Sequence, residues 1–169
     1  MDVVAGLAKL LSSSDIHKRL AAAVVVAELQ PKDAKVVAAL EAMAGDAIDV
    51  IATHGIVGLK ALGSAKSLPV LLNAFERGGD VRKAASDAIA SFGADTLPAI
   101  KERSEKATPE LRAAYSQLLA HVGGKQSFKL ALDGLYGQTP DAANKVALSV
   151  RHELKDASEA EKRAVAGQV

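Results

Sequence analysis

The sequence predicts an all-α protein, an α–α superhelix of about five stacked helical hairpins. Two observations predict this fold. First, the Ala-rich segment DVRKAASDAIASFG at residues 80–93 has counterparts at 110–123, 50–63 and 17–30, so similar segments return every 30 to 33 residues. Second, the apolar residues of each copy are spaced as on one face of an α-helix. A period of this length indicates helical repeats that bury one another's apolar faces.

The helix that opens each repeat is defined by its apolar face and by its end. The four copies align on their last apolar residue: Leu29, Leu62, Phe92 and Val122. Positions three, four, seven and eight residues earlier are mostly small or apolar, which places them on the same helical face. The next residue is a glycine in three copies: Gly63, Gly93 and Gly123. Glycine there predicts a left-handed C-terminal cap, and Gln30-Pro31 stops the helix in the first copy.

A second helix follows the first in each repeat, and Pro69 and Pro98 stand at matching positions in its first turn, where proline is tolerated. The second helices are expected at 32–43, 65–77, 95–106 and 125–136. The sequence therefore predicts a single domain over residues 1–169, with a capping helix at 1–11 and repeat units at 15–44, 46–78, 79–106, 108–137 and 139–168. The last unit shows no cap and no polar closing face, which favours a fragment of a longer stack.

Composition and charge limit the classes of protein to which this chain can belong. Apolar residues make up 49% and charged residues 24%, as in a soluble folded domain. The net charge of +1 provides no overall field toward nucleic acid or anionic lipid, so neither is an expected partner. The absence of cysteine excludes disulfides and thiolate metal sites. The apolar run at 20–27 is too short to span a bilayer and the N-terminus lacks a basic leader, so the cytoplasm is the expected compartment.

Residues 80–100, DVRKAASDAIASFGADTLPAI, resemble the HEAT-like repeat of the variety found in phycobilin lyases. The shared pattern is Val-Arg-x-x-Ala-Ala, then a glycine, then a second helix that begins around Leu-Pro. The resemblance covers residues 12–155, although the second copy has Ala52 where the family has arginine. It implies an α-solenoid (an armadillo-like superhelix) that acts as a scaffold or adaptor.

Arginine recurs at one position of the first helices: Arg19, Arg82 and Arg112. One interpretation is a basic stripe for phosphates, but no aromatic residues interleave for base stacking. The resemblance implies the other interpretation, a structural role. Each arginine would then pair with a carbonyl or an aspartate between repeats, such as Asp80.

The candidate partner-binding residues form a weakly acidic row at outward positions of the second helices, which the resemblance places on the concave face. They are Glu41, Asn73, Glu76, Glu102, Glu105 and Asp133. Such a row predicts a groove for a basic peptide or helix. The alternative is an ordinary solvated face without a partner.

The second copy departs from its siblings at His54, which stands where they have alanine, with Gly55 and Gly58 beside it. One hypothesis is a polar notch between repeats, and the other is local repacking in which small neighbours make room for the ring. Glycine inside a helix costs about 1 kcal/mol relative to alanine. This copy is therefore also a candidate flexible joint.

Catalytic signatures are missing from the sequence. His152-Glu153 has no second histidine at the zinc-binding spacing, and Gly124-Lys125 lacks the remaining residues of a phosphate loop. We therefore expect no catalytic, metal or cofactor site, and a non-catalytic protein-binding scaffold whose partner is another protein or further repeats of the same chain. One alternative, from the resemblance alone, is a phycobilin lyase subunit or a chaperone of cofactor attachment. A HEAT-like DNA glycosylase is less favoured, since the chain has no Trp and little net charge.

Overall fold

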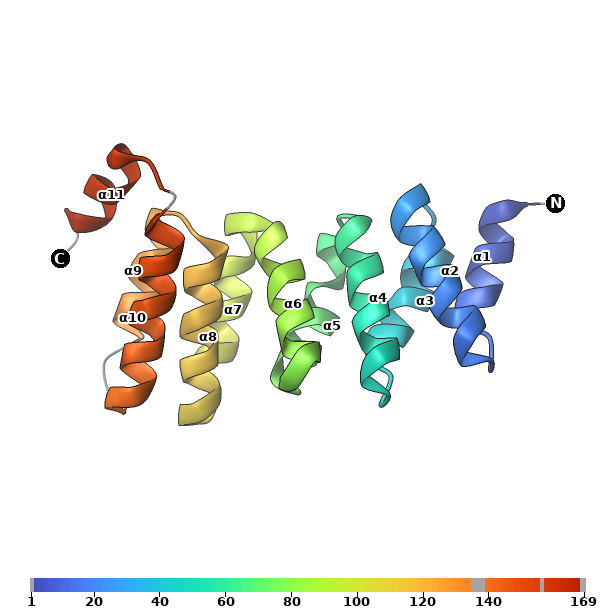
Figure 1. The fold of residues 1–169 in the computed structure, drawn as a ribbon, viewed down its shortest axis with the longest axis horizontal. Helices are drawn as coiled ribbons and strands as arrows, with labels where there is room; N and C mark the ends of the chain where they lie inside the picture. The colour runs from blue at the N-terminus through green and yellow to red at the C-terminus, as the bar shows by residue number, and fades with distance from the viewer. Residues whose placement is uncertain (1, 135–138, 156, 168–169) are drawn as a thin grey trace. The chain divides into compact units, whose positions relative to one another are not determined.

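The computed structural model describes residues 2–134, 139–155 and 157–167 (Figure 1). Within these ranges the regular secondary structure is helical and no strand is present, so the predicted all-α fold is confirmed. The chain divides into two compact units, Met1–Ser91 and Phe92–Val169. The division falls between the two helices of the predicted third repeat. Each unit is described separately below, and the prediction of one domain stays a prediction.

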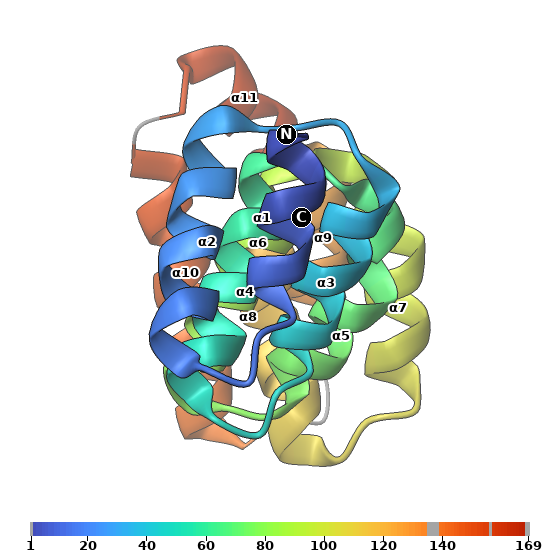
Figure 2. The same cartoon turned by 90° about the vertical axis from the view of Figure 1, so that its right-hand side faces the viewer.

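The first unit contains six α-helices: α1 (Val3–Leu11), α2 (Ile16–Leu29), α3 (Ala34–Ala44), α4 (Asp49–Ala61), α5 (Leu68–Glu76) and α6 (Gly79–Ser91). Helix α4 packs between α2 and α6 in one layer, and α3 and α5 form a second layer beside them (Figures 1 and 2). Helix α1 packs on both α2 and α3. Short aliphatic residues fill the space between the layers, with Val26, Leu40, Ile51 and Leu59 fully buried.

The second unit contains a short 3-10 helix, η2 (Gly93–Thr96), and five α-helices: α7 (Leu97–Glu105), α8 (Pro109–Val122), α9 (Lys125–Asp133), α10 (Pro140–Lys155) and α11 (Glu159–Ala166). Helix α8 is its centre, because it packs against α7, α9 and α10. Tyr115 and Leu118 of α8 are buried there, together with Val146 of α10. Helix α11 packs against α9.

Local capping explains where the helices begin. The side chains of Asp2, Asp15 and Asp33 each accept hydrogen bonds from two backbone N–H groups of the following turn. Thr108 and Thr139 cap α8 and α10 through their hydroxyl oxygens, each of which accepts a hydrogen bond from the backbone N–H three residues later. Aspartate and threonine are among the residues that favour this position, so the sequence itself explains these helix starts.

The second helices differ from prediction at their starts. The expected helices at 65–77 and 95–106 each begin as a 3-10 turn, η1 (Ala65–Ser67) and η2, before α5 and α7. Leu68 and Leu97, which precede Pro69 and Pro98, are themselves in the α conformation, so the prolines do not explain these tighter turns. Both prolines lie in the first α-helical turn, as predicted. The fourth second helix, α9, ends at Asp133, and the remainder of its predicted range includes residues outside those described.

The helix ends follow the glycine pattern. Gly63, Gly93 and Gly123 have φ values of 62°, 70° and 74°, so all three take positive φ as expected. Gly123 nevertheless differs from the predicted left-handed cap, because its ψ is 176°. Gln30 takes the left-handed conformation without being glycine, with φ 47° and ψ 50°. For an L-residue this conformation costs about 1–2 kcal/mol. Gln30 is thus a strained end to α2.

The glycines of the second copy lie where α4 meets α3. A Cβ on Gly55 would lie 2.6 Å from the backbone nitrogen of Ala44 and 2.8 Å from the carbonyl oxygen of Leu40. A Cβ on Gly58 would lie 2.7 Å from Cδ2 of Leu40. The two glycines therefore let α3 approach closely, and α3 takes the space they leave. His54 instead turns to its own helix, where Nδ1 lies 2.8 Å from the carbonyl oxygen of Val50.

Candidate functional site

The predicted partner-binding row is divided between the two units. In the first unit Glu41 lies on α3, and Asn73 and Glu76 lie on α5, which packs against α3. In the second unit Glu102 and Glu105 lie on α7 and Asp133 lies on α9. Four members are exposed (Asn73, Glu102, Glu105 and Asp133), and Glu41 and Glu76 are half-buried.

Glu41 contributes to the packing of its own unit. The hydroxyl of Ser67, a fully buried residue of η1, donates a hydrogen bond to Oε1 of Glu41 at 2.6 Å. The hydroxyls of Ser64 and Ser67 lie 2.8 Å apart, which extends this polar chain. A hydrogen bond from a hydroxyl to a charged carboxylate is stronger than one between neutral groups, so it compensates well for the burial of the Ser67 hydroxyl. Glu41 therefore links α3 to the start of α5 and is a weaker candidate for a partner contact.

The acidic residues of α7 are matched by lysines of the same helix and its end. Lys106 Nζ lies 2.7 Å from Oε1 of Glu102, and Lys101 Nζ lies 3.9 Å from Oε1 of Glu105. The hydrogen bond from Lys106 is the main cause that lowers the pKa of Glu102 below its usual value. All four side chains are more than half exposed. Exposed pairs of this kind contribute little to stability, so a partner could replace the lysines at low cost.

Arg19 bridges α2 to the loop before α4. Its Nη1 donates a hydrogen bond to Oδ2 of Asp46 at 2.8 Å, and the two side chains are only 18% and 21% exposed. Oδ1 of Asp46 accepts a second hydrogen bond, at 2.9 Å, from the backbone N–H of Ile48. That backbone bond, followed by the bond from Arg19, holds the pKa of Asp46 below its ordinary value.

The other two recurring arginines reach backward to main-chain carbonyls. Arg82 Nε donates to the carbonyl oxygen of Phe75 at 2.9 Å, and its guanidinium carbon lies 5.4 Å from the centre of the Phe75 ring. Arg112 Nη2 donates to the carbonyl oxygen of Ala107 at 3.2 Å. Asp80, which the sequence offered as an example of a partner, takes no part in the hydrogen bonds of Arg82, which go to Phe75 and Glu76.

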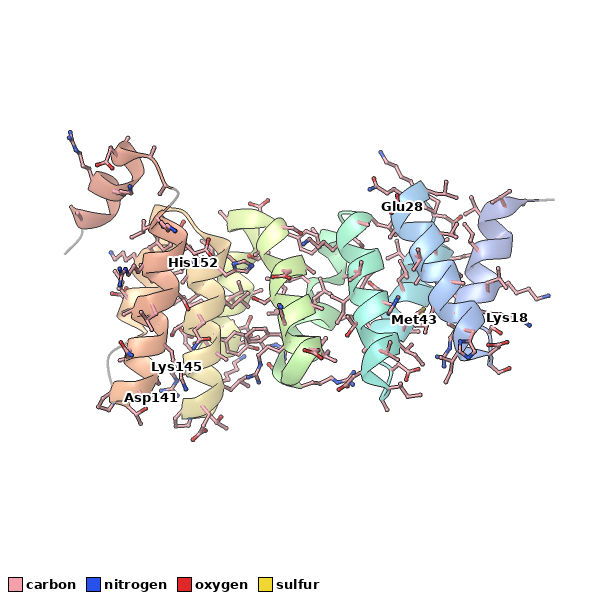
Figure 3. The ribbon with its side chains drawn as sticks, viewed as in Figure 1. Lys18, Glu28, Met43, Asp141, Lys145 and His152 are labelled. Carbon is pink, nitrogen blue, oxygen red and sulfur yellow. The ribbon has the colours of Figure 1, made fainter. Side chains whose placement is uncertain are left out.

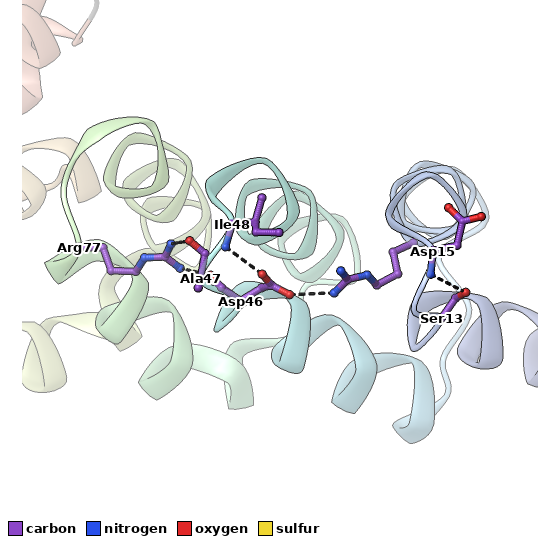
Figure 4. Close-up of polar contacts among 7 residues, drawn as sticks. Ser13, Asp15, Asp46, Ala47, Ile48 and Arg77 are labelled. Atoms are coloured by element: carbon purple, nitrogen blue, oxygen red, sulfur yellow. Dashed lines mark hydrogen bonds and ion pairs between the residues drawn. The ribbon is translucent and has the colours of Figure 1, made fainter.

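Sequence reasoning missed Arg77, which follows α5. Its Nη1 donates to the carbonyl oxygen of Asp46 at 2.6 Å, and its Nη2 donates to the carbonyl oxygen of Ala47 at 3.3 Å (Figure 4). Nη2 also donates to Oδ1 of Asp49 at 2.6 Å. At the repeat period Asp46 corresponds to Glu76 and Ala47 to Ala107, whose carbonyl oxygens accept hydrogen bonds from Arg82 and Arg112. The second copy has Ala52 instead of the recurring arginine, and Arg77 supplies the missing guanidinium. The departure at Ala52 was the signal that could have prompted a search for another cation.

The histidines do not assemble a metal site in the part of the chain that the structure describes. No group of three or more His, Asp or Glu residues is placed there to hold a metal ion. His121 of α8 lies with Nδ1 3.1 Å from Oε1 of Glu153 on α10, whereas His152 is exposed on α10 (Figure 3). Among the described helices none is long and apolar enough to cross a lipid bilayer.

Comparison with known proteins adds no assignment. No protein-family model matches the sequence, and no curated protein matches it. The roles of the residues therefore follow from their own contacts. Those contacts place the recurring arginines and Glu41 in the packing of the helices, and they leave the exposed members of the row on the surface.

Proposed function

We propose that this protein is a non-catalytic, cytoplasmic scaffold built from HEAT-like helical repeats, and that it binds another protein through the exposed side of its second helices. The observation that carries this proposal is the exposure of polar, mostly acidic side chains on the second helices. The arginines of the first helices and Arg77 are engaged in contacts within the chain. Asn73, Glu102, Glu105 and Asp133 are exposed on α5, α7 and α9.

The chemistry of the row favours a basic segment of the partner. Glu102 and Glu105 already hold ammonium groups at 2.7 Å and 3.9 Å, so the surface accepts cations in this geometry. Lysine or arginine side chains of a partner could take the places of Lys101 and Lys106. Arginine is suited to this role because its planar guanidinium binds carboxylates through two parallel hydrogen bonds.

The aromatic residues argue against the DNA glycosylase alternative. Base extrusion requires aromatic or apolar side chains at an open site that can stack on the flipped base. Among the described aromatic residues, Phe75, Tyr115 and Phe128 are at most 5% exposed and form part of the core, and Phe92 is half-buried. A gel shift of double-stranded DNA at low salt, where electrostatic binding is strongest, tests this directly. Tight retardation there would contradict the scaffold proposal.

The experiment that tests the proposed function is affinity capture with two matched charge-reversal variants. One variant, Glu102→Lys with Asp133→Lys, changes the row. The control, Glu28→Lys with Asp141→Lys, makes the same charge change on exposed side chains of α2 and α10 (Figure 3). Glu102 and Asp141 each pair with a lysine four residues later, so the two variants also lose comparable ion pairs.

The proposal expects proteins that the wild-type chain and the control capture equally and that the row variant loses. Equal capture by all three chains would remove the row as the binding surface. Attachment of a bilin to a phycobiliprotein upon mixing with the chain would replace the scaffold proposal by the lyase-type function.

A further inference from the structure

The first two helices expose six large apolar side chains, and four of them carry the argument. Val3 and Leu10 of α1 are 65% and 42% exposed, and Val25 and Leu29 of α2 are 42% and 60% exposed. We call these four residues the N-terminal apolar face. Figure 2 looks onto α1 from this end of the first unit, with α2 beside it. No other helix of the first unit covers α1 from that side.

The next repeat shows what kind of surface covers the corresponding positions. Val25 and Leu29 correspond, 33 residues later, to Gly58 and Leu62. Gly58 is buried against Leu40 of α3, and Leu62 is half-buried. Helix α3, which covers Gly58, has 11 residues, and α1, which packs on α2, has 9. The N-terminal apolar face is therefore suited to pack against the aliphatic side chains of another helix, as Gly58 packs against Leu40 of α3.

Helix α1 is complementary to a second α1 that runs in the opposite direction. Val3, Gly6 and Leu10 lie at spacings of three and four residues and therefore share one face. Asp2 and Lys9 are exposed near opposite ends of the helix. When two such helices cross antiparallel near Gly6, Asp2 of each lies toward Lys9 of the other, and the helix dipoles also oppose favourably. A two-fold axis makes each of these contacts twice.

We infer that the N-terminal apolar face binds a second copy of this chain, in a symmetric dimer in which two α1 helices cross antiparallel at Gly6. Val3 of one copy then lies near Leu10 of the other, and Val25 and Leu29 flank the pair. The interface is small, so the dimer is weak and its population depends on protein concentration. This surface is separate from the partner-binding row, and the inference does not rest on the proposed function.

A cysteine at the crossing point provides the sharpest test, because the chain contains no cysteine. A Cβ on Gly6 meets no atom within 4 Å, so Gly6→Cys introduces no clash. The two-fold axis brings the two introduced sulfurs together, and mild oxidation should give a disulfide-linked dimer. The control is Val57→Cys, at a residue that is 48% exposed on α4 and lies outside this face. This control should form the disulfide at least about tenfold more slowly than Gly6→Cys. A tenfold difference corresponds to about 1.4 kcal/mol.

Sedimentation velocity of the full chain supplies an independent measurement. Between about 10 µM and 1 mM the wild-type chain should shift from monomer toward dimer, the range in which weak interfaces associate. Leu10→Lys should raise the dimer dissociation constant at least about tenfold, whereas Val57→Lys should leave it unchanged. Circular dichroism identifies any variant that fails to fold. A chain that is monomeric throughout this range, or Gly6→Cys that cross-links no faster than Val57→Cys, would overturn the inference.

Discussion

Arg19 of α2 donates a hydrogen bond from Nη1 to Oδ2 of Asp46 at 2.8 Å, and so connects one repeat to the loop that begins the next. The same carboxylate accepts from the N–H of Ile48, and the equivalent bond 33 residues earlier runs from the N–H of Asp15 to Oγ of Ser13 (Figure 4). Unlike the Ser13 hydroxyl in that equivalent bond, the Asp46 side chain also accepts the hydrogen bond from Arg19. Nε of Arg19 is buried without a hydrogen-bond partner among the described residues. The guanidinium therefore depends strongly on Asp46.

Replacing Asp46 should destabilise the first unit. Asp46→Asn retains an oxygen for the Ile48 N–H but leaves the half-buried guanidinium of Arg19 without its counterion, a loss of about 1–3 kcal/mol. Asp46→Ala also removes the bond to Ile48 and should cost more. Urea denaturation followed by circular dichroism measures both. Asp95→Asn, at an exposed residue of η2, is the control, and an equal effect there would contradict the special role of Asp46.

Acid should weaken the protein through the same carboxylate. The pKa of Asp46 is lower in the folded state, so its contribution is present above the unfolded-state pKa of about 4 and is lost as the pH falls through the folded value. The free energy of unfolding should therefore decrease on acidification below about pH 4, and the decrease should be smaller in Asp46→Asn. Urea titrations at a series of pH values test this. Parallel pH profiles for the two proteins would show that Asp46 does not contribute.

Alanine at Gly55 should be strongly destabilising because its Cβ would meet backbone atoms of α3 at 2.6 Å and 2.8 Å. We expect a loss of more than about 2 kcal/mol, since the helices must separate to admit the methyl group. Gly58→Ala should cost less, because the closest atoms belong to the movable side chain of Leu40. Gly6→Ala has open space and should raise stability by about 0.5–1 kcal/mol. Thermal unfolding of the three variants gives this order, and a neutral Gly55→Ala would contradict the close packing.

Glycine at residue 30 should stabilise the protein. Gln30 has φ 47°, a conformation that costs an L-residue about 1–2 kcal/mol and glycine almost nothing. After the greater chain entropy of glycine in the unfolded state is subtracted, Gln30→Gly should gain about 0.5–1 kcal/mol. Gln30→Ala keeps the strain and should show no such gain. The midpoint of urea denaturation distinguishes them, and equal midpoints for the two variants would argue against strain at this residue.

Much of the fold followed from features that act within a few residues. The caps at Asp2 and Asp15 involve backbone groups of the next turn, and the glycines after the first helices satisfy a local requirement for positive φ. The helical periodicity of the apolar residues likewise needs no knowledge of distant parts. For this reason the all-α class and most helix positions could be predicted. The 3-10 turns before Pro69 and Pro98 were not predicted.

The candidate site was less predictable because its residues depend on atoms about 30 positions away. In the sequence Glu41 resembles Glu102, but only the packing of η1 brings Ser67 to its carboxylate. The glycines beside His54 suggested flexibility, and the approach of α3 shows that they serve close packing.

The sequence by itself determined the repeat, its helices and their caps, because each of these depends on local backbone geometry and on the period of apolar residues. Tertiary structure alone decided which cation binds which loop: Arg77 takes the place left by Ala52, and the carbonyls that it binds lie about 30 positions earlier in the chain. It also decided that Val25 and Leu29 remain exposed although they occupy core positions of the pattern. Burial depends on what lies opposite a side chain, and that is set by the length and placement of a different helix.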